Sequence, residues 1–363
     1  MNRVKEINNL GQSIWLDFFD REIMDNGSLQ QLIDVDGLSG ITSNPSIFEK
    51  AITSSADYDE DIAQHGSSQM NNIDLFFNLA VHDIQRAADI LKPIFDKTNG
   101  RDGYVSIEVS PYLAHDTEGT VQQAKQLWNQ VNRKNVMIKI PSTAEGLPAI
   151  RRCIAAGINV NITLLFGLER YREVTDAYLA GLEDRVNANL PISPIASVAS
   201  FFLSRIDVLL DPILASSDGS SIKGKVAIAS AKLAYSIYKE VFGSQRFKKL
   251  EAAGAHTQKV LWASTGTKNP AYSDVKYVES LIGPDTINTL PLNTIDAFRD
   301  HGIARPSIEE NIEDAKNTLE VLKEKGILLN EITQKLEDEG IVKFNKAFDQ
   351  LLQAIESKRK KAG

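Results

Sequence analysis

The amino-acid sequence predicts an α/β fold in which residues 1–363 form a single (β/α)₈ TIM barrel with additional helices. Three observations lead to this prediction. Short β-branched runs alternate with longer segments of helical periodicity, the runs number eight, and no linker or low-complexity stretch divides the chain. With 363 residues, 42% of them hydrophobic, the chain can bury the large core that such a barrel needs.

The predicted strands are rich in β-branched and apolar residues, which suit a buried parallel sheet. They are residues 13–17, 38–43, 103–109, 135–140, 157–163, 192–199, 259–264 and 286–290. Segments with helical spacing lie between them, among them residues 72–95, 117–131, 168–188 and 275–282. An unbroken alternation of this kind is typical of parallel strands joined by helical crossovers.

Three segments are expected to add helices to the barrel. Residues 57–69 are polar and predict a helix after the second strand, and residues 222–242 lengthen the connection between the sixth and seventh strands. Residues 307–363 form a C-terminal extension of two predicted helices that pack back on the barrel. The basic residues 358–361 are interpreted as a frayed end. Apolar residues recur at helical spacing in the extension, at Leu319, Leu322, Ile332, Leu336, Phe344, Phe348, Leu351 and Leu352.

Charge and composition argue against several classes of function. The net charge of −8 disfavours a broad nucleic-acid or anionic-membrane surface, and no stretch has the length of an apolar membrane span. Cys153 is the single cysteine, which excludes an intramolecular disulfide and predicts a cytoplasmic location. The five histidines are scattered without metal-ligand spacing, so no metal site is expected. The surface composition leaves the oligomeric state open and is compatible with a homo-oligomer.

Lys139 lies within the apolar segment 136–140, directly before Pro141. A buried cation is costly, and an amine that loses its proton in a low-dielectric site can attack a ketone to form a Schiff base. The alternative is a lysine on an edge strand whose long side chain reaches water. Polar residues on the neighbouring strands favour the first interpretation.

Side chains alternate across a strand, so each predicted strand has an inward and an outward face. The outward faces of the first, third, fourth and fifth strands are apolar, whereas the inward faces carry polar residues near the C-terminal end. Enzymes of this fold place their active sites at that end. The structural alternative is an ion network that pairs the lysine with a carboxylate. The inward polar residues are Asp17, Asn44, Glu108, Lys139, Asn161 and Thr163.

With these residues in view, the chain resembles the transaldolase family, the Schiff-base enzymes of the pentose phosphate pathway. Five segments carry the resemblance, in the order in which that family has them. The segment from Thr42 to Ser46 is similar to the family's T-x-N-P-S signature, and the segment from Asn161 to Phe166 is similar to its N-x-T-L-L-F strand. The five matching segments are residues 13–17, 40–46, 106–109, 138–146 and 157–166.

The resemblance implies four catalytic residues. Lys139 would form the Schiff base, and Asp17 would exchange a proton with the substrate's C4 hydroxyl. Glu108 would move protons during imine formation, with Thr163 holding a water. No organic cofactor or metal is expected, because the lysine supplies the electron sink.

The resemblance also implies six substrate-binding residues. Two amides would hold the dihydroxyacetone unit, a serine and an arginine would bind the phosphate, and a phenylalanine would lie near the substrate. After the seventh strand a lysine stands where many relatives have an arginine, and a lysine is a point charge without the planar guanidinium fork. The two amides are Asn44 and Asn161, and the phosphate ligands are Ser200 and Arg205. The phenylalanine is Phe202 and the lysine is Lys268.

The reaction implied by the resemblance transfers a dihydroxyacetone unit from sedoheptulose 7-phosphate to glyceraldehyde 3-phosphate, giving erythrose 4-phosphate and fructose 6-phosphate. Its partners would be small sugar phosphates, with no nucleic acid and no membrane. A fructose-6-phosphate-type aldolase that releases free dihydroxyacetone is the nearest alternative. Two others are a retaining glycosidase that uses Asp17 and Glu108 as its carboxylate pair, and a barrel retained for binding alone.

Overall fold

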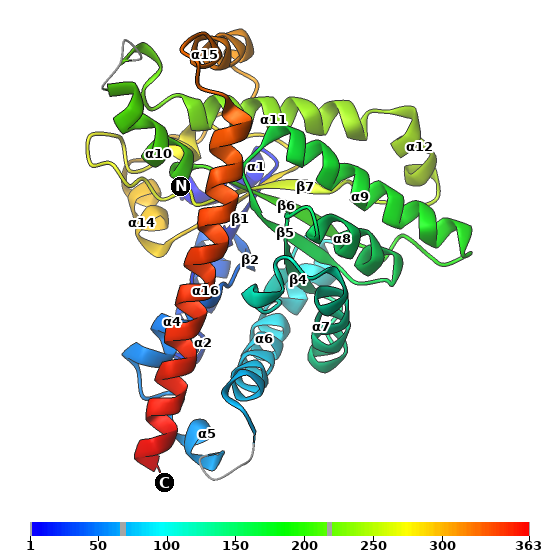
Figure 1. The fold of residues 1–363 in the computed structure, drawn as a ribbon, viewed down its shortest axis with the longest axis vertical. Coiled ribbons are helices and arrows are strands. Elements are labelled where there is room, and N and C mark those ends of the chain that lie inside the picture. The colour runs from blue at the N-terminus through cyan, green and yellow to red at the C-terminus, as the bar shows by residue number, and fades with distance from the viewer. Residues whose placement is uncertain (1, 66–69, 216–219, 363) are drawn as a thin grey trace.

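The computed structural model describes residues 2–65, 70–215 and 220–362. Within them, eight parallel strands form a closed barrel in chain order, with β8 pairing back to β1. Helices surround the barrel (Figure 1), so the predicted fold class is confirmed. The strands are β1 (Gln12–Leu16), β2 (Leu38–Ile41), β3 (Tyr104–Glu108), β4 (Val136–Pro141), β5 (Val160–Leu165), β6 (Ser197–Phe202), β7 (Lys259–Ala263) and β8 (Thr286–Leu290).

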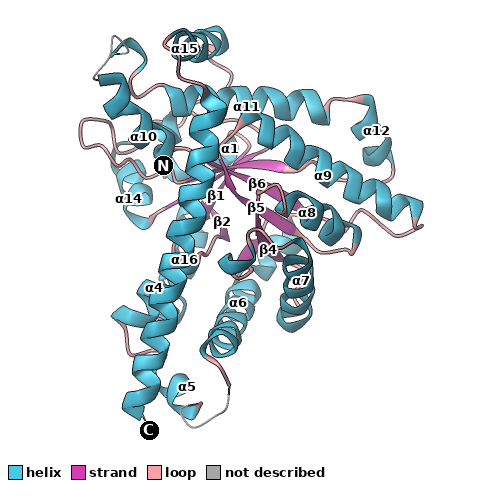
Figure 2. Cartoon of the chain, in the orientation of Figure 1, coloured by secondary structure: helices cyan, strands magenta, loops and turns pink. Residues whose placement is uncertain are grey.

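Most of the chain that is not in strands is helical (Figure 2). The α-helices of the described residues are α1 (Arg3–Asn9), α2 (Arg21–Asp25), α3 (Ser28–Gln31), α4 (Pro45–Ser54), α5 (Asp59–Gln64), α6 (Asn72–Lys97), α7 (Thr117–Val131), α8 (Gly146–Ala155), α9 (Leu168–Asn187), α10 (Ser204–Ala215), α11 (Val226–Phe242), α12 (Gln245–Ala252), α13 (Lys276–Glu279), α14 (Leu292–His301), α15 (Ile312–Glu324) and α16 (Leu329–Ala362). A π-helix, η1 (Leu32–Asp36), and two 3₁₀ helices, η2 (Pro111–Leu113) and η3 (Ser220–Ile222), complete the described elements.

Several predicted elements differ from the observed ones, and the fifth strand, expected at residues 157–163, lies at Val160–Leu165. The sixth strand was expected at residues 192–199 but lies at Ser197–Phe202. Ile192 and Ile195 are buried, yet the amide of Ile195 donates to the carbonyl of Ile192, so these apolar residues anchor a turn. The helix expected at residues 275–282 is the short α13. The predicted helix at residues 57–69 contains α5, and residues 66–69 lie outside the described part of the chain.

The N-terminal end of the barrel interior is filled by packed and hydrogen-bonded side chains. The indole of Trp15 is 1% exposed, and its Nε1 donates to Asp102 Oδ1 at 2.8 Å. A Cβ atom at Gly40 would lie 2.4 Å from that indole, so only glycine fits beside it on β2. The hydroxyl of Ser13 donates to the same carboxylate. These hydrogen-bonded side chains form the floor of the barrel, which also borders a cavity of about 440 Å³ lined by residues such as Tyr104, Met137 and Ser197 at the starts of β3, β4 and β6.

The C-terminal extension packs on the barrel's helices, as predicted. Helix α15 lies against α11, and α16 crosses the barrel in front of β1 and β2 (Figure 1). Helix α16 contacts α4, η2 and α10, which directly follow β2, β3 and β6, and it also contacts α5, α6 and β5. The extension therefore covers part of the end at which the predicted polar residues gather.

The prediction of a frayed basic end is wrong. Helix α16 continues to Ala362, and its last turns are bound to the segment around α5. Lys358 Nζ donates to the carbonyl of Ser55 at 2.8 Å and pairs with Asp59. Arg359 Nη1 donates to the carbonyl of Met70 at 2.9 Å. These charges hold the end of the helix in place.

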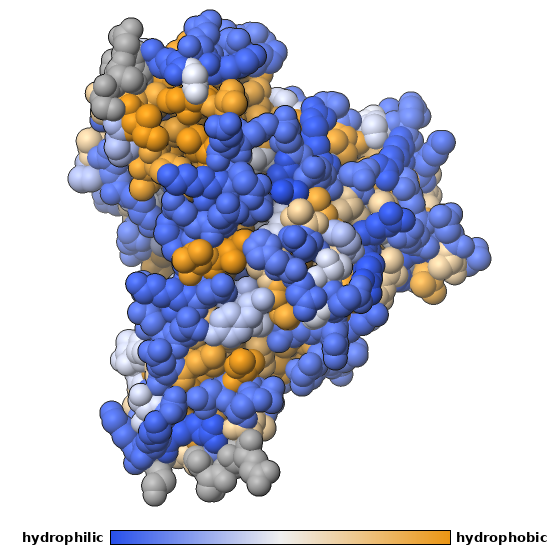
Figure 3. Space-filling model, viewed as in Figure 1, coloured by the Kyte–Doolittle hydropathy of each residue, from blue (hydrophilic) through white to orange (hydrophobic). Residues whose placement is uncertain are grey.

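The surface seen in Figure 3 is mostly hydrophilic, with hydrophobic residues gathered over α10 beside α15. Val208 and Ile213 of α10 are exposed large hydrophobic residues. Among the described residues, no helix is both long enough and apolar enough to cross a membrane.

Candidate active site

The polar residues predicted to point into the barrel lie at the C-terminal ends of their strands. Asp17 directly follows β1, Glu108 is the last residue of β3, and Lys139 and Thr163 lie in the second halves of β4 and β5. Asn44 follows β2 as the N-cap of α4, where Pro45 occupies the first turn. The strands therefore deliver these side chains to one end of the barrel.

Glu108, Lys139 and Asn161 form a row across three neighbouring strands. In the parallel ladder, Glu108 is the register partner of Lys139, and Lys139 is the partner of Asn161. Register partners point to the same side of a sheet, so the three side chains share the barrel interior. A carboxyl, an amine and an amide thus stand side by side. This row is the central geometric feature of the site.

Lys139 is enclosed, so the interpretation of an edge-strand lysine reaching water is wrong. Its side chain is 5% exposed, and its Nζ donates to the carbonyl of Ser43 at 2.9 Å. The same nitrogen lies 3.4 Å from Glu108 Oε2. Both carboxyl oxygens of Glu108 are buried without a hydrogen-bond partner in the described chain. The pair is therefore not a self-satisfied ion network, and it leaves polar atoms for a ligand.

Burial raises the pKa of both carboxyl groups. For Glu108, desolvation raises the pKa and the charge of Lys139 lowers it by less. For Asp17, desolvation again dominates, while Lys139, Thr42, Lys268 and Arg205 lower the pKa. Both acids therefore hold a proton to higher pH than an ordinary carboxyl group, which suits proton transfer near neutral pH.

Thr42 fixes the carboxylate of Asp17. Its Oγ1 donates to Asp17 Oδ1 at 3.0 Å and lies 2.8 Å from Thr289 Oγ1. This bond stabilises the ionised form of Asp17. Sequence reasoning did not assign this role to Thr42, although the residue begins the T-x-N-P-S segment and its proximity to Asp17 follows from the pairing of β1 with β2.

Asn161 is held by two hydroxyl groups. Its Nδ2 donates to Ser106 Oγ at 2.9 Å, and its Oδ1 accepts from Ser200 Oγ at 2.7 Å. Ser200 is therefore placed beside the amide, and its proton is engaged there. The side-chain oxygen of Asn44 accepts from the amide of Ile47 at 3.0 Å, which leaves its Nδ2 as the donor that a substrate hydroxyl can meet.

The backbone of β5 changes direction after Thr163. The ladder to β6 shifts between Ile162 and Leu165, and Leu164 has a φ of +55°. A bulky residue in the left-handed region costs about 1–3 kcal/mol and persists only where the surroundings hold it. Thr163 Oγ1 is buried and has no hydrogen-bond partner in the described chain. Because no group in that part of the chain satisfies it, Thr163 Oγ1 is free to bind a ligand or a water molecule in the site.

Two cations stand beside this row. Arg205 lies in the first turn of α10, and its Nη1 is buried without a hydrogen-bond partner among the described residues. Its guanidinium carbon lies 5.2 Å from the ring centre of Phe202. Burial lowers the pKa of Arg205, and the charges of Asp17 and Glu108 oppose that effect. Lys268 is exposed on the loop after β7, near enough for its charge to act on Asp17.

Sequence reasoning missed a pair of hydroxyl groups near these cations. Ser204 Oγ and Ser264 Oγ lie 2.9 Å apart at the start of α10. Ser264 has a φ of +55° and directly follows β7. A hydroxyl at the end of a barrel strand, four residues before Lys268, was the available signal.

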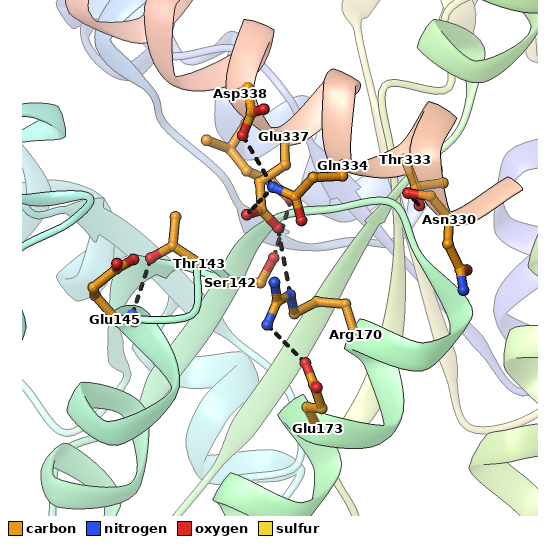
Figure 4. A network of polar contacts seen from close by, with 12 residues as sticks. Ser142, Thr143, Glu145, Arg170, Glu173, Asn330, Thr333, Gln334, Glu337 and Asp338 are labelled. Carbon is orange, nitrogen blue, oxygen red and sulfur yellow. Dashed lines mark hydrogen bonds and ion pairs between the residues drawn. The ribbon is translucent and has the colours of Figure 1, made fainter. Parts of the chain in front are cut away.

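Helix α16 borders the site and is fastened to α9 beside it. Glu337 is 5% exposed, and its Oε2 lies 3.5 Å from Arg170 Nε. Figure 4 shows Glu337 pointing from α16 toward Arg170, while Gln334 donates to Glu337 and Asp338 on the same helix. Burial raises the pKa of Glu337, and the bond from Gln334 and the charge of Arg170 lower it by less. Sequence periodicity placed no member of α16 at the site.

An enclosed amine beside a carboxyl group, at this end of a barrel, suits Schiff-base chemistry. Among the described residues, no three His, Cys, Asp or Glu side chains form a group that could hold a metal ion. The fold and this site together define a Schiff-base-forming barrel enzyme.

The chain matches the family model of transaldolase/fructose-6-phosphate aldolase over residues 14–355. A transaldolase of Trichodesmium erythraeum is 48% identical over 99% of this chain and 98% of its own length. Transaldolase 1 of Streptomyces avermitilis is 46% identical over 98% and 95%, and a transaldolase of Thiobacillus denitrificans is 43% identical over 98% and 100%. The chain belongs to the transaldolase/fructose-6-phosphate aldolase family of enzymes. The resemblance is confirmed, and the glycosidase and non-catalytic interpretations lose their support.

Proposed function

We propose that the chain is a transaldolase that transfers a dihydroxyacetone unit from sedoheptulose 7-phosphate to glyceraldehyde 3-phosphate through a Schiff base on Lys139. The observation that carries this proposal is the row of Glu108, Lys139 and Asn161, which places an enclosed amine between a proton donor and an amide. Family membership and the names of the relatives support it.

In the first half of the reaction, the neutral amine of Lys139 attacks C2 of the ketose phosphate, and a carbinolamine forms. Glu108 donates the proton with which the C2 hydroxyl leaves as water, giving the iminium ion. The raised pKa of Glu108 keeps that proton available. Thr163, with its unpaired hydroxyl, would hold the water through which the proton moves.

The carbon–carbon bond breaks once the iminium ion is present. Asp17 takes the proton of the C4 hydroxyl, the C3–C4 bond cleaves, and its electron pair enters the iminium group to form an enamine. The aldose phosphate leaves. The enamine carbon then attacks the aldehyde of the acceptor, Asp17 returns its proton to the new hydroxyl, and hydrolysis frees Lys139.

The remaining site residues would bind the substrate. Asn161 and the free Nδ2 of Asn44 are placed for the donor's hydroxyl groups. Arg205, with an unpaired Nη1, is the preferred phosphate ligand, and Lys268 adds a second positive charge. Ser200 would have to release Asn161 to bind phosphate, so we assign it to support of the amide instead. Phe202 would contact the substrate beside Arg205.

The alternative is an aldolase that releases free dihydroxyacetone, since the family model covers both activities. The two differ in whether the enamine is captured by an aldose or by a proton. We expect fructose 6-phosphate to be consumed rapidly only when erythrose 4-phosphate is present, with sedoheptulose 7-phosphate as the product. Free dihydroxyacetone formed at the same rate without acceptor would favour the aldolase.

We further propose that the enzyme acts in the cytoplasm on small sugar phosphates and that the whole chain is one domain. The single buried Cys153 supports a reducing compartment. The packing of α15 and α16 on the barrel's own helices supports one folding unit. Sedimentation of the purified chain would show whether it forms a homo-oligomer.

A further inference from the structure

We propose that Phe344, on helix α16, is a positioning residue for phosphate recognition that acts through Arg205. The inference rests on the proposed function, in which Arg205 binds the phosphate of the substrate. It assigns to the C-terminal extension a part in substrate selection, in addition to its packing on the barrel.

The first observation is that two aromatic rings lie near the Arg205 guanidinium. Its carbon lies 5.2 Å from the ring centre of Phe202 and 6.0 Å from that of Phe344. Phe344 is 5% exposed, so its ring is held by its own packing. Two rings on different elements limit the orientations of a planar cation. The unpaired Nη1 is thereby kept in one direction.

The second observation is how closely α16 approaches this cation. A Cβ atom at Gly340, one turn before Phe344, would lie 3.7 Å from Arg205 Nη1 and 2.9 Å from Leu164 Cδ2. Glycine therefore lets the helix backbone reach both the guanidinium and the residue that follows Thr163. The helix forms a wall of the proposed phosphate site at this point.

The third observation is the anchor that sets the position of this wall. Roughly two helical turns before Phe344, the buried Glu337 meets Arg170 of α9 at 3.5 Å (Figure 4). Thr333 lies against the start of the same helix, since a Cβ atom at Gly167 would be 3.0 Å from its hydroxyl. These contacts fix α16 relative to β5 and α9, and hence fix the ring of Phe344.

A phosphate needs a guanidinium fork in a defined plane, whereas the imine chemistry at Lys139 does not. Loss of the Phe344 ring should therefore weaken the binding of phosphorylated substrates without slowing the reaction of bound substrate. Unphosphorylated dihydroxyacetone, which forms its imine with Lys139 alone, should be unaffected.

The experiment compares Phe344→Leu with Phe348→Leu, a matched control one turn further along the same face of α16. Phe348 packs on Phe76, Phe77 and Tyr112, with ring centres 5.5, 6.3 and 5.3 Å away. For Phe344→Leu we expect the KM of fructose 6-phosphate to rise about tenfold, with kcat changed by less than about twofold. Phe344→Tyr should restore the KM. For Phe348→Leu we expect an unchanged KM.

Borohydride trapping with dihydroxyacetone is the second readout, and both leucine variants should be trapped at the wild-type rate. In an Arg205→Ala background, Phe344→Leu should have no further effect on the KM. A KM increase that persists in that background, or that Phe348→Leu reproduces, would overturn the proposal. If Phe344→Leu does not fold, Gly340→Ala tests the approach of α16 to Arg205 instead, because its methyl group would lie against Leu164 and near Arg205 Nη1: an unchanged KM of fructose 6-phosphate would likewise overturn the proposal. Failure of the wild-type enzyme to form any adduct with fructose 6-phosphate would instead refute the proposed function.

Discussion

The two ends of the barrel interior are built from the same strands but use their polar atoms differently. At the N-terminal end, Trp15 Nε1 and the amide of Gly103 both donate to Asp102, and the side chain of Asn159 meets three backbone groups. At the C-terminal end, Glu108 and Thr163 keep buried oxygens that accept or donate no hydrogen bond among the described residues, although Glu108 is ion-paired with Lys139. An unpaired buried polar atom is costly, so the fold does not explain it. Asp102 and Asn159 at the floor therefore serve stability, although Gln12 and Gln258 at that end also keep one buried oxygen each without a partner in the described chain. The unpartnered oxygens at the C-terminal end differ because they lie around a buried amine, which suits them to a ligand.

The largest effect should come from removing the amine. Lys139→Ala should reduce kcat by about 10⁴-fold or more and abolish imine trapping, because no other amine occupies the row. The fold should survive the loss of the amine. Burial raises the pKa of the Glu108 carboxyl group, so that group can remain protonated and neutral when its ion-pair partner is gone. Circular dichroism and steady-state rates check both points. Substantial residual turnover would show that the C-terminal end of the barrel does not act through Lys139.

Glu108→Gln should lower kcat by about 10²- to 10³-fold, because an amide cannot exchange the proton. Burial raises the pKa of Glu108, so its ionised form is less favourable in the folded protein than in the unfolded chain. The stability associated with this group is present below the unfolded pKa and is lost as pH rises through the folded one. Urea unfolding from about pH 4 to about pH 8 should show the variant gaining stability relative to wild type. If the free energy of unfolding changed with pH in the same way in wild type and variant, the prediction would be wrong.

Asp102→Ala tests the floor. The change removes the acceptor of the indole and of the Ser13 hydroxyl, so the free energy of unfolding should fall by about 2–4 kcal/mol. The kcat of the folded fraction should stay within about twofold of wild type. Chemical denaturation and rates normalised to trappable sites provide the measurement. A large loss of kcat at unchanged stability would show that the N-terminal end of the barrel also takes part in catalysis.

Thr42→Val should have the smallest effect and sharpens the account of Asp17. The lost hydrogen bond stabilises the carboxylate, so the pKa of Asp17 should rise further. The acid limb of the kcat profile should therefore move to higher pH by about one unit. If the acid limb of the kcat profile did not move, ionisation of Asp17 could not be what sets it.

The sequence predicted the barrel and the inward polar residues because strand periodicity is local and because parallel strands share a direction. It could not place Phe344 beside Arg205, since helical spacing shows which face of α16 is apolar but not which surface receives it. The shift of β6 has a similar origin: Ile192 is buried equally well in a turn or in a strand. The partners of Ser200 and Thr42 depend on the closure of the barrel, which brings hydroxyl groups from separate strands together.

The proposed mechanism requires that the enclosed amine of β4 becomes covalently bound to the substrate. Reduction with borohydride in the presence of fructose 6-phosphate, followed by peptide mass spectrometry, tests it directly. We expect a three-carbon dihydroxyacetone remnant on Lys139 and on no other lysine. An adduct on Lys268, or no adduct under turnover conditions, would contradict the account.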